Sequence, residues 1–442
     1  MEKQIPRVSL IKFLRHSIDI LKNPLPFHRQ NFEKHGDTFR LMIGFRKSVV
    51  FSRDAAFARH TLQKNHKNYT KSKIQTEDVA KYVGKGLLTA EGEHWKKQRR
   101  LIQPAFHKKQ LTSLLETVLE AIQAELLKIK TGTPQDIFPV FNDLAFQTVV
   151  KALFSSAVSP SEIKRLQKIT EETQQMLVKE LRQPYLKWWF HVSGKLKSVL
   201  QLTADARGIL RELIHERKLS NKKQGDLLDM LLDARYEDGT AMDEDQLIDE
   251  ILILFTAGHE TTSNALTFTC ELLARHPEVQ EKILSEVKKA ASKSENLMEY
   301  MKACPYTKQV LEESMRLYPP AYFIDRVNIE EDTFNGMRIP KGTNLLFSLH
   351  EIHIHPNFWE EPEAFKPERF SEGSGKYSSH YYPFGAGPRM CVGNNFAMYE
   401  MVLAITEMVS KYKVSTKTTP IKILPLITMK PKDAILEFNL RE

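Results

Sequence analysis

The chain has 442 residues and a formal net charge of +9, from 64 lysines and arginines against 55 aspartates and glutamates. A hydrophobic share of 41% suits a globular protein with a large core and excludes a disordered chain. The basic residues are spread along the chain and form no recognition motif, so we expect no nucleic-acid partner.

The first residues of the chain bear on targeting and membrane insertion. Residues 1–23 alternate basic with apolar residues, and Arg15, His16 and Asp19 interrupt any hydrophobic run. No stretch approaches the ~20 apolar residues that span a bilayer, so we expect neither a signal peptide nor a stable membrane anchor. Residues 39–52 carry apolar and β-branched runs around a central glycine, which predicts a short β-hairpin.

Helical patterns dominate the rest of the chain. Residues 110–236 predict successive amphipathic helices. Short breaks separate them at 132–134, 159–160 and 222–224. Residues 243–275 contain no proline and predict a helix about 50 Å long, which His276-Pro277 ends. A β-rich section that includes residues 336–349, a helix after Cys391 and paired C-terminal strands complete the pattern.

The most informative segment is residues 384–393, which read Phe-Gly-Ala-Gly-Pro-Arg-Met-Cys-Val-Gly. Its glycines allow the backbone to approach a flat ligand closely. The thiolate of Cys391 would lie near the N-terminus of the next helix, where unpaired N–H groups lower the pKa of a thiol. An axial haem thiolate needs this chemistry. The alternative is a buried structural cysteine.

Cysteine usage also bears on the cellular compartment. The other two cysteines, Cys270 and Cys304, lie far from Cys391 in the sequence and offer no disulfide framework. This usage fits a reducing compartment, and we expect a cytoplasmic protein.

A second motif lies in the middle of the long predicted helix, where residues 257–262 read Ala-Gly-His-Glu-Thr-Thr. Glycine costs about 0.5–1 kcal/mol relative to alanine inside a helix, so another demand outweighs helix propensity here. A threonine hydroxyl in this motif can bond to the carbonyl one turn earlier and bend the helix. Glu260 and Thr261 together suit proton delivery, and the alternative is an ordinary core helix that carries threonines. We expect His259 to be structural or surface-facing.

Two further pairs of residues have helical spacing. Glu313 and Arg316 share one helix face at i,i+3 and can form an ion pair. Trp95 and Arg99, at i,i+4, present an indole N–H and a guanidinium on one face. The alternative for this second pair is an amphipathic basic helix with a half-buried tryptophan.

Together these motifs resemble those of the cytochrome P450 family: FxxGxRxCxG ending at Gly393, AGxETT at 257–262 and ExxR at 313–316. The resemblance extends from about Phe39 to the end of the chain. It implies a mainly α fold with small β-sheets and a long central helix over a haem. It also implies one α-rich domain over residues 1–442, with residues 1–38 as an N-terminal extension packed on it.

The resemblance implies haem b (iron protoporphyrin IX) with Cys391 as the iron ligand and Phe384 packed near the sulfur. Gly258 would give clearance for dioxygen, and Glu260 and Thr261 would guide protons for cleavage of the O–O bond. The implied partners of the haem propionates are Trp95, Arg99, Arg326 and Arg389. A buried network that holds the core is implied for Glu313, Arg316 and Arg369.

The implied reaction is that of a monooxygenase, which inserts one oxygen atom from O2 into an unactivated C–H bond of a small organic substrate. The product is an alcohol, or results from oxidative O-demethylation where the carbon bears an ether oxygen. We expect too few residues after Cys391 for a fused reductase, so the resemblance implies electrons from a separate ferredoxin and an NAD(P)H-dependent ferredoxin reductase. We also expect a monomer. The alternatives are a non-catalytic haem sensor or carrier and a peroxygenase, and neither needs the Glu260–Thr261 pair.

The substrate stays open between fatty acids, terpenoids, and methoxylated sugars or aromatics. The family's substrate contacts fall near residues 70–88 and 183–194. The second region contains Trp188 and Trp189, which line a substrate channel or form a hydrophobic surface patch.

Overall fold

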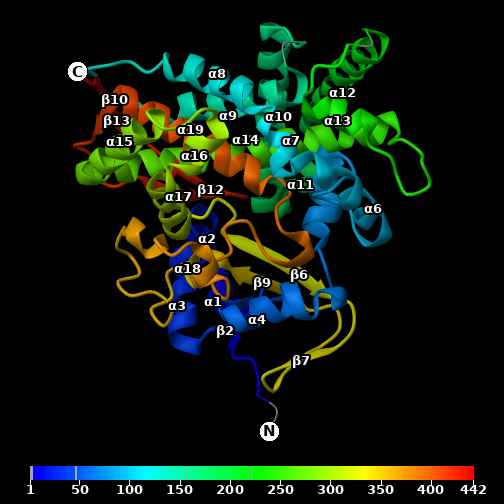
Figure 1. Cartoon of the computed structure of the whole chain (residues 1–442). Coiled ribbons are helices and arrows are strands. Elements are labelled where there is room, and N and C mark those ends of the chain that lie inside the picture. Colours follow the sequence, from blue (N-terminus) through cyan, green and yellow to red (C-terminus); the bar gives the residue numbers. More distant parts are fainter. Residues whose placement is uncertain (1–2, 45–46, 156, 221) are drawn as a thin grey trace.

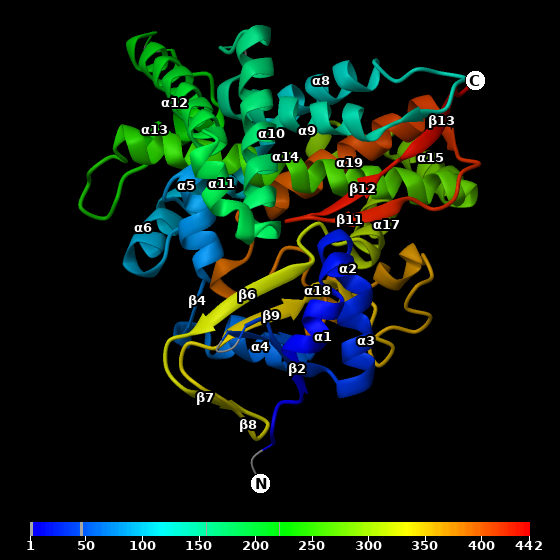
Figure 2. The ribbon, with the colours of Figure 1, turned by 180° about the vertical axis from the view of Figure 1, so that it is seen from behind.

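The computed structural model describes residues 3–44, 47–155, 157–220 and 222–442. Figure 1 shows the long helices in the upper part of the molecule, and the main sheet with the N-terminal helices in the lower part. Figure 2 shows the same arrangement from behind. The expected mainly α fold with small sheets is confirmed. Within the described ranges, no helix is long and apolar enough to cross a membrane.

The α-helices are α1 (Leu10–Arg15), α2 (Ser17–Lys22), α3 (Leu25–His35), α4 (Ala55–Arg59), α5 (Ala80–Val83), α6 (Gly92–Ile102), α7 (Lys108–Thr112), α8 (Leu115–Leu126), α9 (Phe138–Phe154), α10 (Pro160–Arg182), α11 (Lys187–Val192), α12 (Lys195–Ser220), α13 (Leu227–Asp233), α14 (Glu244–Arg275), α15 (Pro277–Ala291), α16 (Leu297–Lys302), α17 (Pro305–Leu317), α18 (Leu349–His353) and α19 (Asn394–Lys411).

The strands are β1 (Arg7–Val8), β2 (Thr38–Met42), β3 (Ser48–Ser52), β4 (Tyr69–Thr70), β5 (Gln135–Asp136), β6 (Phe323–Asn328), β7 (Asp332–Phe334), β8 (Met337–Ile339), β9 (Asn344–Ser348), β10 (Tyr412–Ser415), β11 (Lys422–Pro425), β12 (Met429–Lys432) and β13 (Ile435–Leu440).

The main sheet has the strand order β1-β2-β3-β9-β6-β4. The hairpin expected at residues 39–52 is β2 and β3, which pair antiparallel with Phe39 opposite Phe51. Its turn includes residues 45–46, which lie outside the described residues. The N-terminal helices pack on this hairpin through Phe32, whose ring lies 5.0 Å from that of Phe39. Aromatic side chains therefore join the first elements to the sheet.

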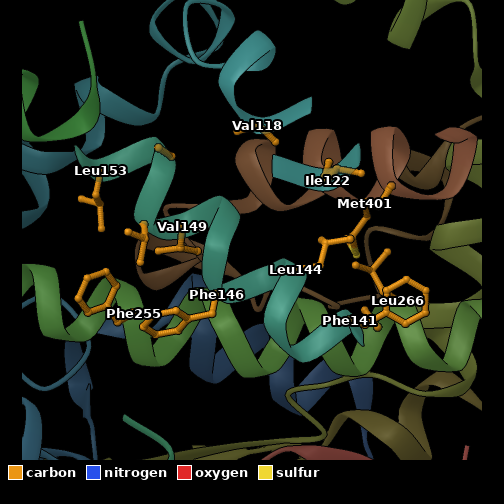
Figure 3. Close-up of a cluster of buried hydrophobic side chains, with 14 of the residues drawn as sticks. Val118, Ile122, Phe141, Leu144, Phe146, Val149, Leu153, Phe255, Leu266 and Met401 are labelled. Carbon is orange, nitrogen blue, oxygen red and sulfur yellow. The ribbon is translucent and has the colours of Figure 1, made fainter. Parts of the chain in front are cut away.

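The long helix expected at residues 243–275 is α14. Asp243 caps its start by accepting a hydrogen bond from the backbone N–H of Gln246, and the helix ends before His276. Figure 3 shows α9 packed along α14, with Phe146 of α9 against Phe255 of α14 at a ring distance of 5.5 Å. This packing fixes α14 in the centre of the helical part, where its middle turns carry the second motif.

Candidate active site

The loop before α19 has the conformation that its glycines predict. Gly385 and Gly387 both have φ of +73°, a left-handed conformation that other residues rarely adopt. A Cβ atom on Gly387 would lie 1.9 Å from the carbonyl oxygen of Leu62, so this position requires glycine. The backbone N–H of Cys391 donates to the carbonyl of Phe384 at 2.9 Å and closes the loop. The loop thereby fixes the cysteine just before α19 begins.

Cys391 keeps accessible surface, yet the dense protein around it raises the pKa of its thiol. The Gly393 N–H and the Arg99 guanidinium act in the opposite direction, because both favour a negative sulfur. The expectation of a lowered thiol pKa from the helix N-terminus is therefore wrong for the protein by itself, since desolvation outweighs these donors. A thiol loses its proton outright when it coordinates a metal ion, so this site fits an iron ligand.

The Thr261 hydroxyl donates a hydrogen bond to the carbonyl of Ala257 at 2.7 Å, as the sequence predicts. Ala257 is exposed in the middle of a largely buried helix, so this face of α14 borders accessible space inside the fold. Gly258 does not share that face. A Cβ atom on Gly258 would lie 3.0 Å from Cγ2 of Val149 on α9. The glycine at this position therefore lets α14 pack closely against α9, and its clearance role for dioxygen stays a prediction.

The Glu260 carboxyl faces the C-terminal hairpin of β11 and β12. Burial raises its pKa, while the ammonium of Lys430 and a hydrogen bond from the Thr428 hydroxyl act against that rise. The amide of Asn264 donates to Thr428 Oγ1 at 3.0 Å, which leaves the hydroxyl proton of Thr428 for the carboxyl. No sequence motif marks Thr428 and Lys430, so their contacts with Glu260 become visible only in the fold.

His259 is buried and not surface-facing. Its ring packs edge-on against Phe146 at 5.2 Å, and burial lowers its pKa to about 3. His259 is therefore neutral at ordinary pH, and of the two expected roles only the structural one remains.

Three cations gather near the cysteine loop. The guanidinium of Arg389 lies 4.2 Å from the centre of the Trp95 ring and pairs with Glu91. Arg326 is buried on β6, and burial lowers its pKa to about 10. Lys71 is a third cation of this cluster, and no sequence motif places it there.

The Lys71 ammonium donates to the backbone carbonyls of Leu87 and Leu88. Burial lowers its pKa to about 7, and repulsion from Arg389 and Arg326 adds to this effect. Carboxylates placed among these three cations would offset the desolvation cost of the buried positive charges and the repulsion between them. The cluster therefore fits the two propionates of a haem.

Arg99 contacts the cysteine loop, and its pairing with a haem propionate stays a prediction. Its Nη1 donates to the carbonyl of Met390 at 2.7 Å, and its Nε donates to Gln103 at 2.9 Å. Met390 directly precedes Cys391, so these hydrogen bonds tie α6 to the cysteine loop. The described contacts of Arg99 thus support the loop that carries the sulfur.

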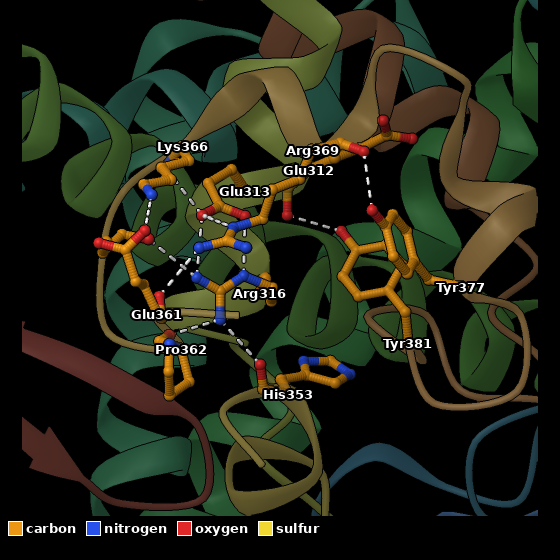
Figure 4. A network of polar contacts seen from close by, with 11 residues as sticks. Glu312, Glu313, Arg316, His353, Glu361, Pro362, Lys366, Arg369, Tyr377 and Tyr381 are labelled. Atoms are coloured by element: carbon orange, nitrogen blue, oxygen red, sulfur yellow. Dashed lines mark hydrogen bonds and ion pairs between the residues drawn. The ribbon is translucent and has the colours of Figure 1, made fainter. Parts of the chain in front are cut away.

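The predicted network of Glu313, Arg316 and Arg369 is present (Figure 4). Arg316 is fully buried and donates to both carboxylate oxygens of Glu313, at 2.7 and 2.8 Å. Arg369 adds a third hydrogen bond to the same carboxylate at 3.3 Å. Arg316 also donates to the backbone carbonyls of three residues outside its helix, His353, Pro362 and Ala364. The network fastens α17 to the segment that leads to the cysteine loop.

Residues 2–438 match the family described as Cytochrome P450. The chain belongs to the cytochrome P450 family. This membership makes the protein a haem b enzyme, an oxidoreductase of the monooxygenase class. It therefore favours the enzyme over the sensor or carrier alternative.

Two bacterial relatives align with this chain over most of its length and most of their own. The chain is 27% identical to Cyclooctat-9-en-7-ol 5-monooxygenase of Streptomyces melanosporofaciens, over 91% of this chain and 88% of the relative. It is 26% identical to Pentalenene oxygenase of Streptomyces avermitilis, over 91% and 89%. Among solved structures, retinoic acid bound cyanobacterial CYP120A1 matches with a TM-score of 0.83 and 24% identity, over the whole of both chains. At 24% identity, the likeness to this solved structure shows a shared fold alone.

Proposed function

We propose that this P450 hydroxylates a terpenoid at an unactivated C–H bond, with Cys391 as the iron ligand. The observation that carries the proposal is the Cys391 thiol, held in a glycine-rich loop by the Gly393 N–H and by Arg99 on the neighbouring Met390 carbonyl. The two bacterial relatives are named for the oxidation of cyclooctat-9-en-7-ol and pentalenene, which supports a terpenoid over the other substrate classes.

Haem b supplies reductive activation of dioxygen when it is bound. Cys391 would ligate its iron, and Phe384 would shield the sulfur from water. Lys71, Arg326 and Arg389 would hold the propionates, with Trp95 packed beneath Arg389.

Glu260 and Thr261 would deliver protons to the place where dioxygen is activated. The hydroxyl proton of Thr261 is donated to Ala257, so its oxygen can accept a hydrogen bond on the exposed face of α14. Thr428 and Lys430 would hold the Glu260 carboxyl toward the β11–β12 hairpin. Glu260 would then be reprotonated from that side after it gives up a proton. A peroxygenase has no need of this pair, which favours the monooxygenase.

We further propose that electrons come from a separate ferredoxin and an NAD(P)H-dependent ferredoxin reductase. The net charge of +9 would steer an acidic ferredoxin, so turnover should fall as salt concentration rises. In this proposal residues 1–442 form one P450 domain with residues 1–38 packed on it, and the protein is a cytoplasmic monomer. Oxidative O-demethylation would follow where the attacked carbon bears an ether oxygen.

The test is a substrate screen by the spin-state shift of the haem Soret band, followed by product analysis with a surrogate ferredoxin system. Terpenoids should cause the shift and yield alcohols. A shift with fatty acids or methoxylated aromatics, and none with terpenoids, would contradict the substrate proposal.

A further inference from the structure

The connection between α5 and α6, residues 84–91, contains no helix or strand, so its backbone groups need partners elsewhere. Side chains of α14 supply some of these partners. Asp249 accepts a hydrogen bond from the backbone N–H of Lys85 at 2.6 Å, and Glu250 accepts one from that of Leu87 at 2.9 Å. One side of the α5–α6 connection is therefore fixed to the central helix.

Lys71, which directly follows β4, holds the α5–α6 connection from another direction. Its ammonium donates to the backbone carbonyls of Leu87, at 3.3 Å, and of Leu88. Its backbone N–H donates to a carboxylate oxygen of Glu91 at 3.0 Å, and the other oxygen of Glu91 pairs with Arg389. The side chain and the backbone of Lys71 thus bind the middle and the end of the connection.

The surroundings of Lys71 leave its ammonium short of negative charge. An ammonium has three N–H groups, and the two backbone carbonyls engage two of them. The guanidinium groups of Arg389 and Arg326 lie near Lys71 and repel it, whereas the carboxylates of Glu91 and Asp325 attract it. Three cations against two carboxylates leave an excess of positive charge. The third N–H of Lys71 therefore suits a further anion, such as a haem propionate.

The α5–α6 connection overlaps residues 70–88, the region in which we expect substrate contacts. Leu87 and Leu88 are half-buried, and their side chains pack against the large core cluster. Their backbone groups are held by Glu250 and by Lys71. The position of this part of the expected substrate region therefore depends on Lys71.

We propose that Lys71 is a positioning residue that joins the haem propionates to the α5–α6 connection. Its ammonium would hold the carbonyls of Leu87 and Leu88 and give its remaining N–H to a propionate. The propionate contact would then stabilise the connection, and the connection would in return hold Lys71 against the propionate. The inference rests on the propionate site of the proposed function and is independent of the substrate class.

Two measurements on the haem-loaded protein test the inference. Hydrogen–deuterium exchange reports how firmly residues 84–91 are held, and the propionate bending bands of the resonance Raman spectrum report hydrogen bonds to the propionates. Lys71→Met keeps an unbranched side chain but loses the N–H groups, so it should speed exchange of residues 84–91 about tenfold and shift a propionate band. Lys73→Met is the matched control, because the Lys73 side chain is 84% exposed, and both readouts should stay at their wild-type values.

The reverse direction is tested by Asp249→Ala, which removes the acceptor of the Lys85 N–H and loosens the connection from the side of α14. This variant should speed exchange of residues 84–91 and shift the same propionate band as Lys71→Met. An unshifted band in Asp249→Ala would overturn the inference. A Lys71→Met protein in which only one of the two readouts changes, or neither, would overturn it as well.

Arg326→Gln separates a failure of this inference from a failure of the proposed propionate site. Arg326 belongs to the same cation cluster and has no printed bond to the α5–α6 connection, so its variant should shift a propionate band. If that shift occurs while Lys71→Met leaves the bands unchanged, the propionate site stands and the role of Lys71 is refuted. Unchanged bands in every variant would contradict the propionate site itself and the inference with it.

Discussion

Glu250 of α14 offers a direct test of how burial and charge act near the active site. Its carboxylate accepts a hydrogen bond from the backbone N–H of Leu87 at 2.9 Å, and a Cβ on Gly86 would approach it to 2.6 Å. The carboxylate therefore clamps the loop after α5 onto the central helix. Burial raises the pKa of Glu250 from 4.5 to about 7.

The variant Glu250→Gln should become more stable relative to wild type as pH rises. The folded state holds the proton of Glu250 more tightly than the unfolded state, so wild type loses stability as pH rises from 4.5 to about 7. A shift of this size corresponds to about 3 kcal/mol in the free energy of unfolding. The glutamine keeps one oxygen for Leu87 and does not ionise, so it escapes this loss.

Urea unfolding of both proteins across this pH window measures the difference. The exposed Glu216→Gln on α12 is the control, and its difference from wild type should stay flat. If the difference in unfolding free energy between Glu250→Gln and wild type does not change with pH, burial does not raise the pKa of Glu250, and the reasoning is refuted.

Variants at three further positions test the active site and its support. Glu313→Gln leaves the Arg316 charge buried with too few partners, so the free energy of unfolding should fall by about 3–5 kcal/mol and haem content should fall with it; wild-type stability would contradict this. Lys430→Met should raise the pKa of Glu260 further and release more hydrogen peroxide per NAD(P)H oxidised. Lys430→Arg should restore coupling, and equal coupling in both variants would count against the proton route. Gly387→Ala forces a Cβ against backbone at positive φ, so haem incorporation should drop sharply, which absorbance after reconstitution would show.

Local chemistry made several features predictable from the sequence. The hydrogen bond from Thr261 to Ala257 lies within one helical turn, and the pair of Glu313 and Arg316 shares one helix face. The glycines before Cys391 indicated a tight loop, because few other residues adopt positive φ. Such features depend on neighbours along the chain, so the sequence contains them.

Other features depend on tertiary neighbours and stayed outside the reach of the sequence. Lys71 joins Arg326 and Arg389 only because distant segments meet beside the cysteine loop. The face of Gly258 follows from helical periodicity, but its contact with Val149 follows from how α9 packs. The thiol pKa of Cys391 was misjudged for the same reason, since desolvation is a property of the whole fold.

The carbon monoxide difference spectrum of the reduced, haem-loaded protein tests the central claim most directly. If Cys391 ligates the iron, wild type should show the thiolate-type Soret absorption, and Cys391→Ser should lose it while the fold persists by circular dichroism. A wild-type spectrum without the thiolate-type band, or a serine variant that retains it, would contradict the account.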